Sequence, residues 1–125
     1  MARWLVDGMN VIGSRPTGWW RDRPGAMGGL AEELSAFAEE SGDEVAVIFD
    51  GKPFELEAPG VDVGFASRRG PDAADDDIAE RVAADSDPAD LRVVTSDATL
   101  AERARGAGAE VVGAGAFRRR LDELG

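Results

Sequence analysis

Apolar residues form five short, nearly continuous runs along the chain, and many of these residues are β-branched. Such runs are typical of strands buried on both faces of a parallel sheet. The first run, Trp4-Leu5-Val6, stops at an aspartate, and the runs "EVAVIFD" and "LRVVTSD" also end in one. The pattern predicts strands at 4–6, 44–50, 61–65, 91–97 and 109–114.

The segments between these runs have apolar residues at helical spacing. Leu30, Leu34 and Phe37 follow one another at i, i+4 and i+7, and Gly42 is a suitable stop. The same spacing predicts helices over 73–84, from Leu100 to Gly106 or Gly108, and around Phe117, Leu121 and Leu124. Strands that alternate with helices indicate a single α/β domain over 1–125, a three-layer α/β/α sandwich with a mainly parallel central sheet.

The segment 13–29, "GSRPTGWWRDRPGAMGG", departs from this alternation. It is rich in Gly, Pro and Arg and carries two adjacent tryptophans. We predict that it is a long irregular segment, and such segments in small domains are often functional.

Acidic residues gather where the predicted strands end. Asp7, Asp50 and Asp97 each close a strand, and the carboxyl ends of parallel strands share one edge of a sheet. The run Asp75-Asp76-Asp77 opens the helix over 73–84 and is predicted to face the same edge. Carboxylates this close repel one another unless a cation lies between them, and oxygen ligands suit Mg²⁺ or Mn²⁺. Such an ion activates water for phosphodiester hydrolysis.

Each carboxylate also has a purely structural interpretation. A strand-end aspartate is often a turn residue or a helix N-cap, and Asp97 is placed to cap the helix that carries Leu100. The run of Asp75, Asp76 and Asp77 also complements a helix dipole. The coincidence of several acids at one edge favours the metal site.

Composition narrows the possible chemistry. The 125-residue chain contains no cysteine, histidine or tyrosine, which excludes Ser-His-Asp catalysis, disulfides and Cys or His metal ligands. The net charge of −11 argues against a general nucleic-acid-binding module but not against a carboxylate nuclease. No apolar run approaches the length of a membrane span or a signal peptide, so we expect a cytoplasmic protein.

Four motifs, "LVDGMNVIG", "VAVIFDG", "ADDDIAERV" and "VVTSDATLAERARGAGAEVV", occur in the order seen in NYN domains of the YacP-like family. This family belongs to the PIN-like nuclease superfamily, and the resemblance covers nearly the whole chain. It implies a PIN-like fold and a metal-dependent endoribonuclease. It also implies hydrolysis by metal-activated water, which leaves a 5′-phosphate and a 3′-hydroxyl.

The resemblance also implies roles for single residues. Asp7 matches the first-strand acid with Asn10 as its partner, Asp75 the first acid of the A-D-x-x-I pattern, and Asp97 the acid of the S-D motif. Some members carry a further acid four residues after this last one, where this chain has Ala101. The implied catalytic residues are Asp7, Asn10, Asp75, Asp76 and Asp97, and the implied ligands of Mg²⁺ or Mn²⁺ are Asp7, Asp50, Asp75 and Asp97.

An acidic protein needs local basic groups to hold a phosphate chain. Arginine pairs with phosphate and tryptophan stacks on unpaired bases, so we expect single-stranded RNA as the partner. In the alternative interpretation, one tryptophan packs the irregular segment onto the domain. A ribosome or another protein is a candidate for presenting the RNA. The predicted substrate-binding residues are Trp19, Trp20, Arg21, Arg23, Arg68, Arg69 and Ser96.

Other functions fit the sequence less well. A phosphotransfer receiver needs an acid pair after the first strand and a lysine after a late strand, and a haloacid-dehalogenase-type phosphatase needs an acid at Met9. The "GAGAF" stretch at 113–117 lies too late in the chain for a dinucleotide site. The remaining alternative is a non-catalytic PIN-like module that binds RNA or protein through a vestigial acidic site.

Overall fold

All five strands of the central sheet run parallel, in the order β3-β2-β1-β4-β5. The computed structural model describes residues 2–68, 70 and 73–124. The strands are β1 (Arg3–Asp7), β2 (Glu44–Phe49), β3 (Val61–Phe65), β4 (Leu91–Val94) and β5 (Glu110–Val112). The helices are α1 (Gly8–Ile12), α2 (Arg23–Ser41), α3 (Ala73–Ala84), α4 (Ala98–Gly106) and α5 (Ala114–Leu124), with short 3₁₀ turns at Trp19–Arg21 and Pro88–Asp90.

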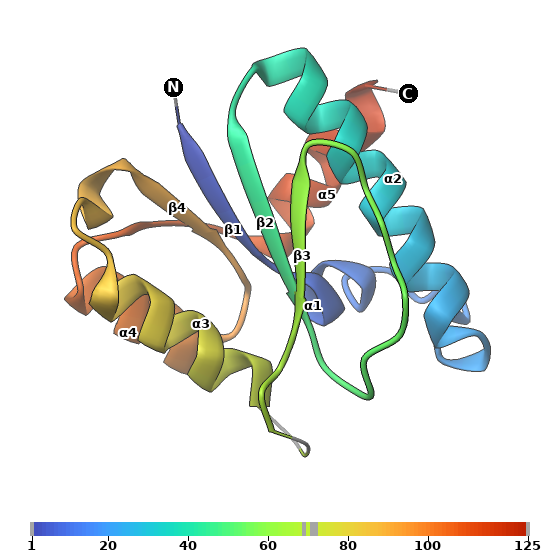
Figure 1. Cartoon of the computed structure of the whole chain (residues 1–125), viewed down its shortest axis with the longest axis horizontal. Coiled ribbons are helices and arrows are strands. Elements are labelled where there is room, and N and C mark those ends of the chain that lie inside the picture. Colours follow the sequence, from blue (N-terminus) through green and yellow to red (C-terminus); the bar gives the residue numbers. More distant parts are fainter. Residues whose placement is uncertain (1, 69, 71–72, 125) are drawn as a thin grey trace.

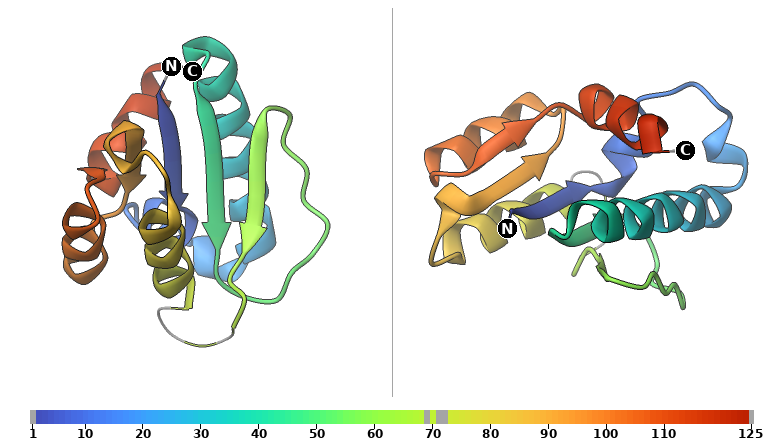
Figure 2. Two further views of the ribbon diagram at one scale, coloured as in Figure 1. Left: turned by 60° about the vertical axis from the view of Figure 1, so that its left-hand side comes forward. Right: turned by 90° about the horizontal axis from the view of Figure 1, so that it is seen from above.

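Helices cover both faces of this sheet, as the α/β/α prediction requires (Figure 1; Figure 2). Within β1, the side chains of Trp4 and Val6 join the core under α2 and α5, whereas Leu5 joins the core under α3 and α4. This is the period-two alternation of a strand buried on both faces. The same alternation assigns Asp7, two residues after Leu5, to the face that α3 and α4 cover.

The segment 13–29 is less irregular than predicted. Helix α2 already begins at Arg23, where Asp22 Oδ1 accepts a hydrogen bond from the Gly25 amide at 3.1 Å and Pro24 occupies the first turn. Burial of Met27 outweighs the low helix propensity of the local glycines. The prediction was therefore wrong for 23–29, and the irregular segment is 13–22 with its 3₁₀ turn.

Further boundaries differ from the predictions. Strands β2 and β4 end at Phe49 and Val94, so Asp50 and Asp97 follow these strands instead of closing them. The short helix α1 directly follows β1, because Val11 and Ile12 are buried there against the α2 and α5 side of the core. The last strand ends at Val112 instead of residue 114, since Ala114 already begins α5. Gly42 ends α2 as predicted, in the left-handed conformation (φ 72°) that glycine adopts readily.

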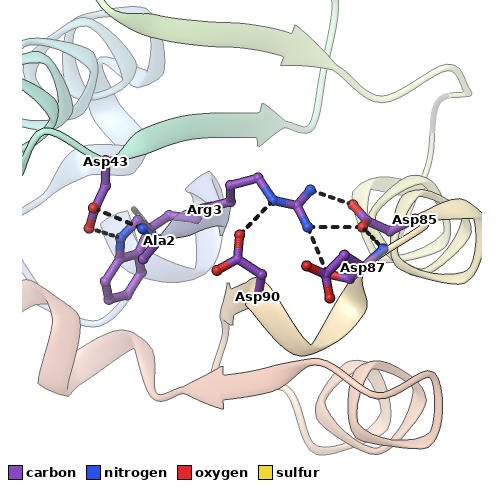
Figure 3. A network of polar contacts seen from close by, with 7 residues as sticks. Ala2, Arg3, Asp43, Asp85, Asp87 and Asp90 are labelled. Carbon is purple, nitrogen blue, oxygen red and sulfur yellow. Dashed lines mark hydrogen bonds and ion pairs between the residues drawn. The ribbon is translucent and has the colours of Figure 1, made fainter.

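A polar network fastens the opposite, amino end of β1 to its surroundings (Figure 3). The Arg3 guanidinium donates to both carboxylate oxygens of Asp85 and to Asp90, and Trp4 Nε1 donates to Asp43 at 2.9 Å. The hydrogen bond from Arg3 is the main cause that lowers the pKa of Asp85 to about 2. This network orients β1 from the end that lies away from the strand-end acids.

Within the described ranges, no helix combines the length and the apolar character that crossing a bilayer would require.

Candidate active site

Asp7 is a buried acid at the carboxyl end of the central strand β1. Its side chain is 3% exposed, and its position in the sheet is opposite Ile48 of β2. Burial raises the pKa of this carboxyl group to about 7, and the negative charge of Asp75 adds to the effect. Burial without a full charge partner is costly for a carboxylate, so this residue is not an ordinary turn aspartate.

Thr95 links Asp7 to the loop that follows β4. Its hydroxyl donates to Asp7 Oδ2 at 3.1 Å and accepts a hydrogen bond from the backbone amide of Asp97 at 3.1 Å. At 1% exposure it is the other buried polar side chain among the described residues. Thr95 was not among the predicted site residues, although a threonine at the end of a buried apolar run was the available signal.

Asp97 is the N-cap of α4, as the structural interpretation predicted. Its Oδ1 accepts a hydrogen bond from the backbone amide of Leu100 at 2.8 Å. The capping bond uses one of the two carboxylate oxygens. The metal role that the resemblance implies for Asp97 is compatible with this cap and stays a prediction.

Asp50 connects the end of β2 to the start of α3. Its Oδ1 accepts a hydrogen bond from the backbone amide of Ala74 at 2.9 Å, one residue before Asp75. The charges of Asp50 and Asp75 both raise the pKa of Asp7, so acids from β1, β2 and α3 interact electrostatically at this edge. The sequence predicted this gathering from two strand ends, at Asp7 and Asp50, and from the acidic start of the helix that carries Asp75.

The donor chemistry of this edge fits a hard divalent cation. Across residues 2–68, 70 and 73–124, no three acidic side chains already lie close enough together to hold an ion as they stand. Asp7 nevertheless carries the desolvation and repulsion from Asp75 and Asp50 that a bound cation would relieve. Carboxylates offer the oxygen ligands that Mg²⁺ and Mn²⁺ prefer.

Asn10 and Ser96 join three elements around the edge. Asn10 Oδ1 accepts a hydrogen bond from the Ser96 amide at 2.7 Å, and the Ser96 hydroxyl accepts one from the Ala114 amide at 2.8 Å. These bonds tie α1 to the β4–α4 loop and to the first residue of α5. The structure therefore gives both side chains a positioning role next to Asp7 and Asp97.

Asp76 forms ion pairs with two arginine side chains. Its two carboxylate oxygens accept hydrogen bonds from Arg68 and from Arg103 of α4, both at 3.0 Å. Sequence analysis singled out Arg68 as a substrate contact but missed Arg103. The spacing of residues within α4 does not indicate that Arg103 pairs with Asp76, because the two lie 27 positions apart in the sequence.

The two tryptophans have different environments. Trp19 is half-buried and packs against the core, and Arg23 lies 5.6 Å from its ring centroid. Trp20 is 55% exposed and meets the Trp19 ring edge-on. Arg21 is exposed on the same turn, whereas Arg69 lies outside the described residues. Trp19 thus has the packing role considered above, and Trp20 presents a free ring face.

Comparison with known proteins gives a consistent result. The family model of the YacP-like NYN domain matches residues 4–125. A crystal structure of Rae1 (YacP) from Bacillus subtilis, its W164L mutant, superposes with a TM-score of 0.82 at 26% identity and covers 99% of this chain and 77% of that one. A second crystal structure of Rae1 (YacP) from Bacillus subtilis gives a TM-score of 0.78 at 25% identity, and the match covers 99% of this chain and 75% of that one.

A search of curated proteins finds no significant match. The family model spans nearly the whole chain, and the parallel sheet with its flanking helices agrees with the fold of these relatives. The chain belongs to the family of YacP-like NYN domains, which have a PIN-like fold.

Proposed function

We propose that this protein is a metal-dependent endoribonuclease. The observation that carries the proposal is the buried carboxylate of Asp7, whose pKa is raised to about 7 at a strand edge that Asp75 and Asp50 also approach. Membership of the YacP-like NYN family supports nuclease chemistry at this place. The single-stranded RNA substrate rests on the chemistry of the exposed Trp20 and the neighbouring arginines.

Asp7, Asp75 and Asp97 would hold the Mg²⁺ or Mn²⁺ ion, with Asp50 at the rim of the site. A bound divalent ion supplies activation of water and stabilisation of the charge that develops on a phosphodiester. Thr95 orients the Asp7 carboxylate by its hydrogen bond, and Asp50 holds the first turn of α3 so that Asp75 stays at the edge. Burial around Asp7 excludes water from that side of the site.

Cleavage of RNA tests this function directly. The parent protein, incubated with a pool of end-labelled single-stranded RNAs and Mn²⁺, should give internal cuts that EDTA abolishes. Asp7→Asn should lower the rate at least about 100-fold, because an amide cannot replace a charged ligand. Asp62→Asn, which removes a charge from an exposed position on β3, is the matched control and should cut like the parent.

Four results would contradict the proposal. Cleavage in EDTA would show that no metal is needed, and equal cleavage by Asp7→Asn would assign the activity to another site or a contaminant. A folded parent that neither cuts RNA nor is stabilised by Mn²⁺ would favour the non-catalytic binding module. A parent that is stabilised by Mn²⁺ but cuts no free RNA would point to a ribosome or protein that presents the substrate. It would contradict the claim that the domain cleaves RNA without a partner.

The two tryptophans should respond differently to substitution. Trp20→Ala should weaken binding of single-stranded RNA by about fivefold or more, because stacking of one base on an aromatic ring contributes about 1–3 kcal/mol. Its melting temperature should match that of the parent, since the ring is largely exposed. Trp19→Ala should instead lower the melting temperature. Fluorescence anisotropy in EDTA and thermal unfolding measure the two effects, and a Trp20→Ala variant with parental affinity would remove this residue from the RNA site.

A further inference from the structure

Asp76 has an environment unlike that of Asp77, the next acid of α3. Arg68, from the loop before the helix, donates to one of its oxygens, and Arg103 of α4 donates to the other. One carboxylate therefore holds two guanidinium groups from different elements side by side. Asp77, next in sequence, instead accepts hydrogen bonds from the backbone amide and the hydroxyl of Ser67.

These ion pairs are exposed and easily exchanged. The side chains of Arg68, Asp76 and Arg103 are 64%, 44% and 43% exposed, respectively. Exposed ion pairs of this kind contribute little to stability, so little free energy opposes a competing anion. A phosphodiester offers two oxygens in a geometry that guanidinium groups bind well, often in a bidentate manner.

The pair of arginines also lies next to the acidic edge. Asp76 directly follows Asp75, whose charge acts on Asp7, and helices α3 and α4 pack against each other. An RNA strand with one phosphate at this edge would therefore pass its next phosphates over the α3–α4 side. Net repulsion by a chain with a charge of −11 makes such a local pair of cations necessary.

We propose that Arg68 and Arg103 form a phosphate-binding pair for the RNA backbone, and that Asp76 occupies this pair in the absence of RNA. Asp76 stands in for the phosphate: it keeps the two guanidinium groups together and is displaced when RNA binds. This inference rests on the proposed function, since it extends the substrate path of the same site. It assigns to Arg103 a substrate contact, and to Asp76 a positioning role instead of the catalytic role that the resemblance implies.

The direction in which one substitution changes the affinity for RNA tests the inference. Removal of the competing charge in Asp76→Asn should lower the Kd for single-stranded RNA, measured in EDTA, by about threefold to tenfold. Arg103→Ala should raise the Kd by a similar factor and reduce the slope of log K against log salt by about 0.7, the value for one phosphate contact. In the double variant, the loss of Arg103 should cancel most of the gain.

Two controls separate this effect from overall charge. Glu80→Gln removes one negative charge from an exposed position of the same helix, one turn after Asp76, and should change the Kd little. Arg105→Ala removes one positive charge from an exposed position of α4 two residues after Arg103, on a different face of the helix. If each control shifts the Kd as much as its test variant, binding responds to net charge and the inference is wrong.

Two further outcomes would overturn parts of the inference. Loss of cleavage by Asp76→Asn without tighter binding would make Asp76 a catalytic residue, as the family resemblance implies, and would overturn the positioning role. RNA binding that is absent from both the parent and Asp76→Asn would overturn the phosphate pair. The proposed function fails separately, when the parent does not cut RNA, because the affinity measurements need no cleavage and no metal.

Discussion

Replacement of Asp7 by asparagine should make the metal-free protein more stable at pH 8, by about 2–4 kcal/mol. The reason is the pKa of Asp7, which rises from 3.8 to about 7 on folding because the carboxyl group is buried and faces Asp75. At pH 8 the folded parent must keep a buried charge that the unfolded chain exposes to water. Asparagine has the same shape, carries no charge and keeps an oxygen that can accept the Thr95 hydrogen bond.

The sign follows from proton linkage. The folded protein binds the Asp7 proton more tightly than the unfolded chain, so the stability that the protonated group contributes is full below about pH 3.8 and is lost as the pH rises through about 7. Parent and variant should therefore be closest in stability near pH 4. The gap should widen up to pH 7 and then stay constant.

Urea unfolding in EDTA at several pH values from 4.5 to 8.5 measures this gap. Asp62→Asn is the control, because Asp62 is exposed and should give a difference that does not change with pH in this way. A variant that is less stable than the parent by the same amount at every pH would show that Asp7 is ionised and well compensated in the folded protein. The inference that the ionised Asp7 carboxylate destabilises the metal-free folded protein would then be wrong.

Under the proposed function, a high concentration of Mn²⁺ should remove or reverse this difference in stability. Binding to the folded state stabilises the parent by about 4.1 kcal/mol at a metal concentration of 1,000 Kd, and Asp7→Asn should gain little. A cation that neutralises the acidic edge also removes the cost of ionising Asp7. The same substitution thus stabilises the apo protein and destroys the activity, which is the expected signature of a residue kept for chemistry.

The sequence predicted the outline of this site for a simple physical reason. Asp7 and Asp50 end apolar runs, and the ends of parallel strands meet at one edge, so local pattern was enough to bring them together. The conformation of Asp97 was also foreseeable, because an N-cap is set by residues three positions away. These features depend on short stretches of chain and on one rule of topology.

The hydrogen bonds and ion pairs of the individual acids depend on partners that are distant in the sequence. Thr95 lies 88 positions from Asp7, and the pairing of Arg103 with Asp76 follows from the way α4 packs on α3. The start of α2 was misjudged because its glycines oppose helix formation locally, while burial of Met27 and Leu30 decides the outcome. Tertiary packing, which no local pattern encodes, determined all three.

Gly8→Ala should destabilise the protein by about 1–3 kcal/mol, which corresponds to a fall in melting temperature of roughly 5–15 °C for a domain of this size. A methyl group at position 8 would come within 2.5 Å of Phe49 Cε1 and 3.0 Å of Val47 Cγ2. Both side chains are fully buried, so neither can move away without disturbing the core. Glycine is needed here for space.

Gly28→Ala is the matched control. Gly28 lies inside α2, and an added methyl group would meet no atom within 4 Å. The same chemical change should therefore stabilise the protein by up to about 1 kcal/mol, because alanine favours a helix over glycine. Opposite signs for the two variants in thermal unfolding would confirm that packing controls position 8, whereas a stable Gly8→Ala variant would show that the Phe49 ring can shift.

The consequence for function follows from the position of Gly8, which directly follows Asp7 and is the first residue of α1. To relieve the clash with Phe49, the backbone after Asp7 would have to move away from β2, and the Asp7 carboxylate would move with it. Catalytic groups that are displaced by about 1 Å can lose about 100-fold in rate. We therefore expect Gly8→Ala to lose RNA cleavage even at temperatures where it is fully folded, while Gly28→Ala keeps it. Parental cleavage by folded Gly8→Ala would show that the acidic edge does not depend on the close packing of Gly8 against Phe49.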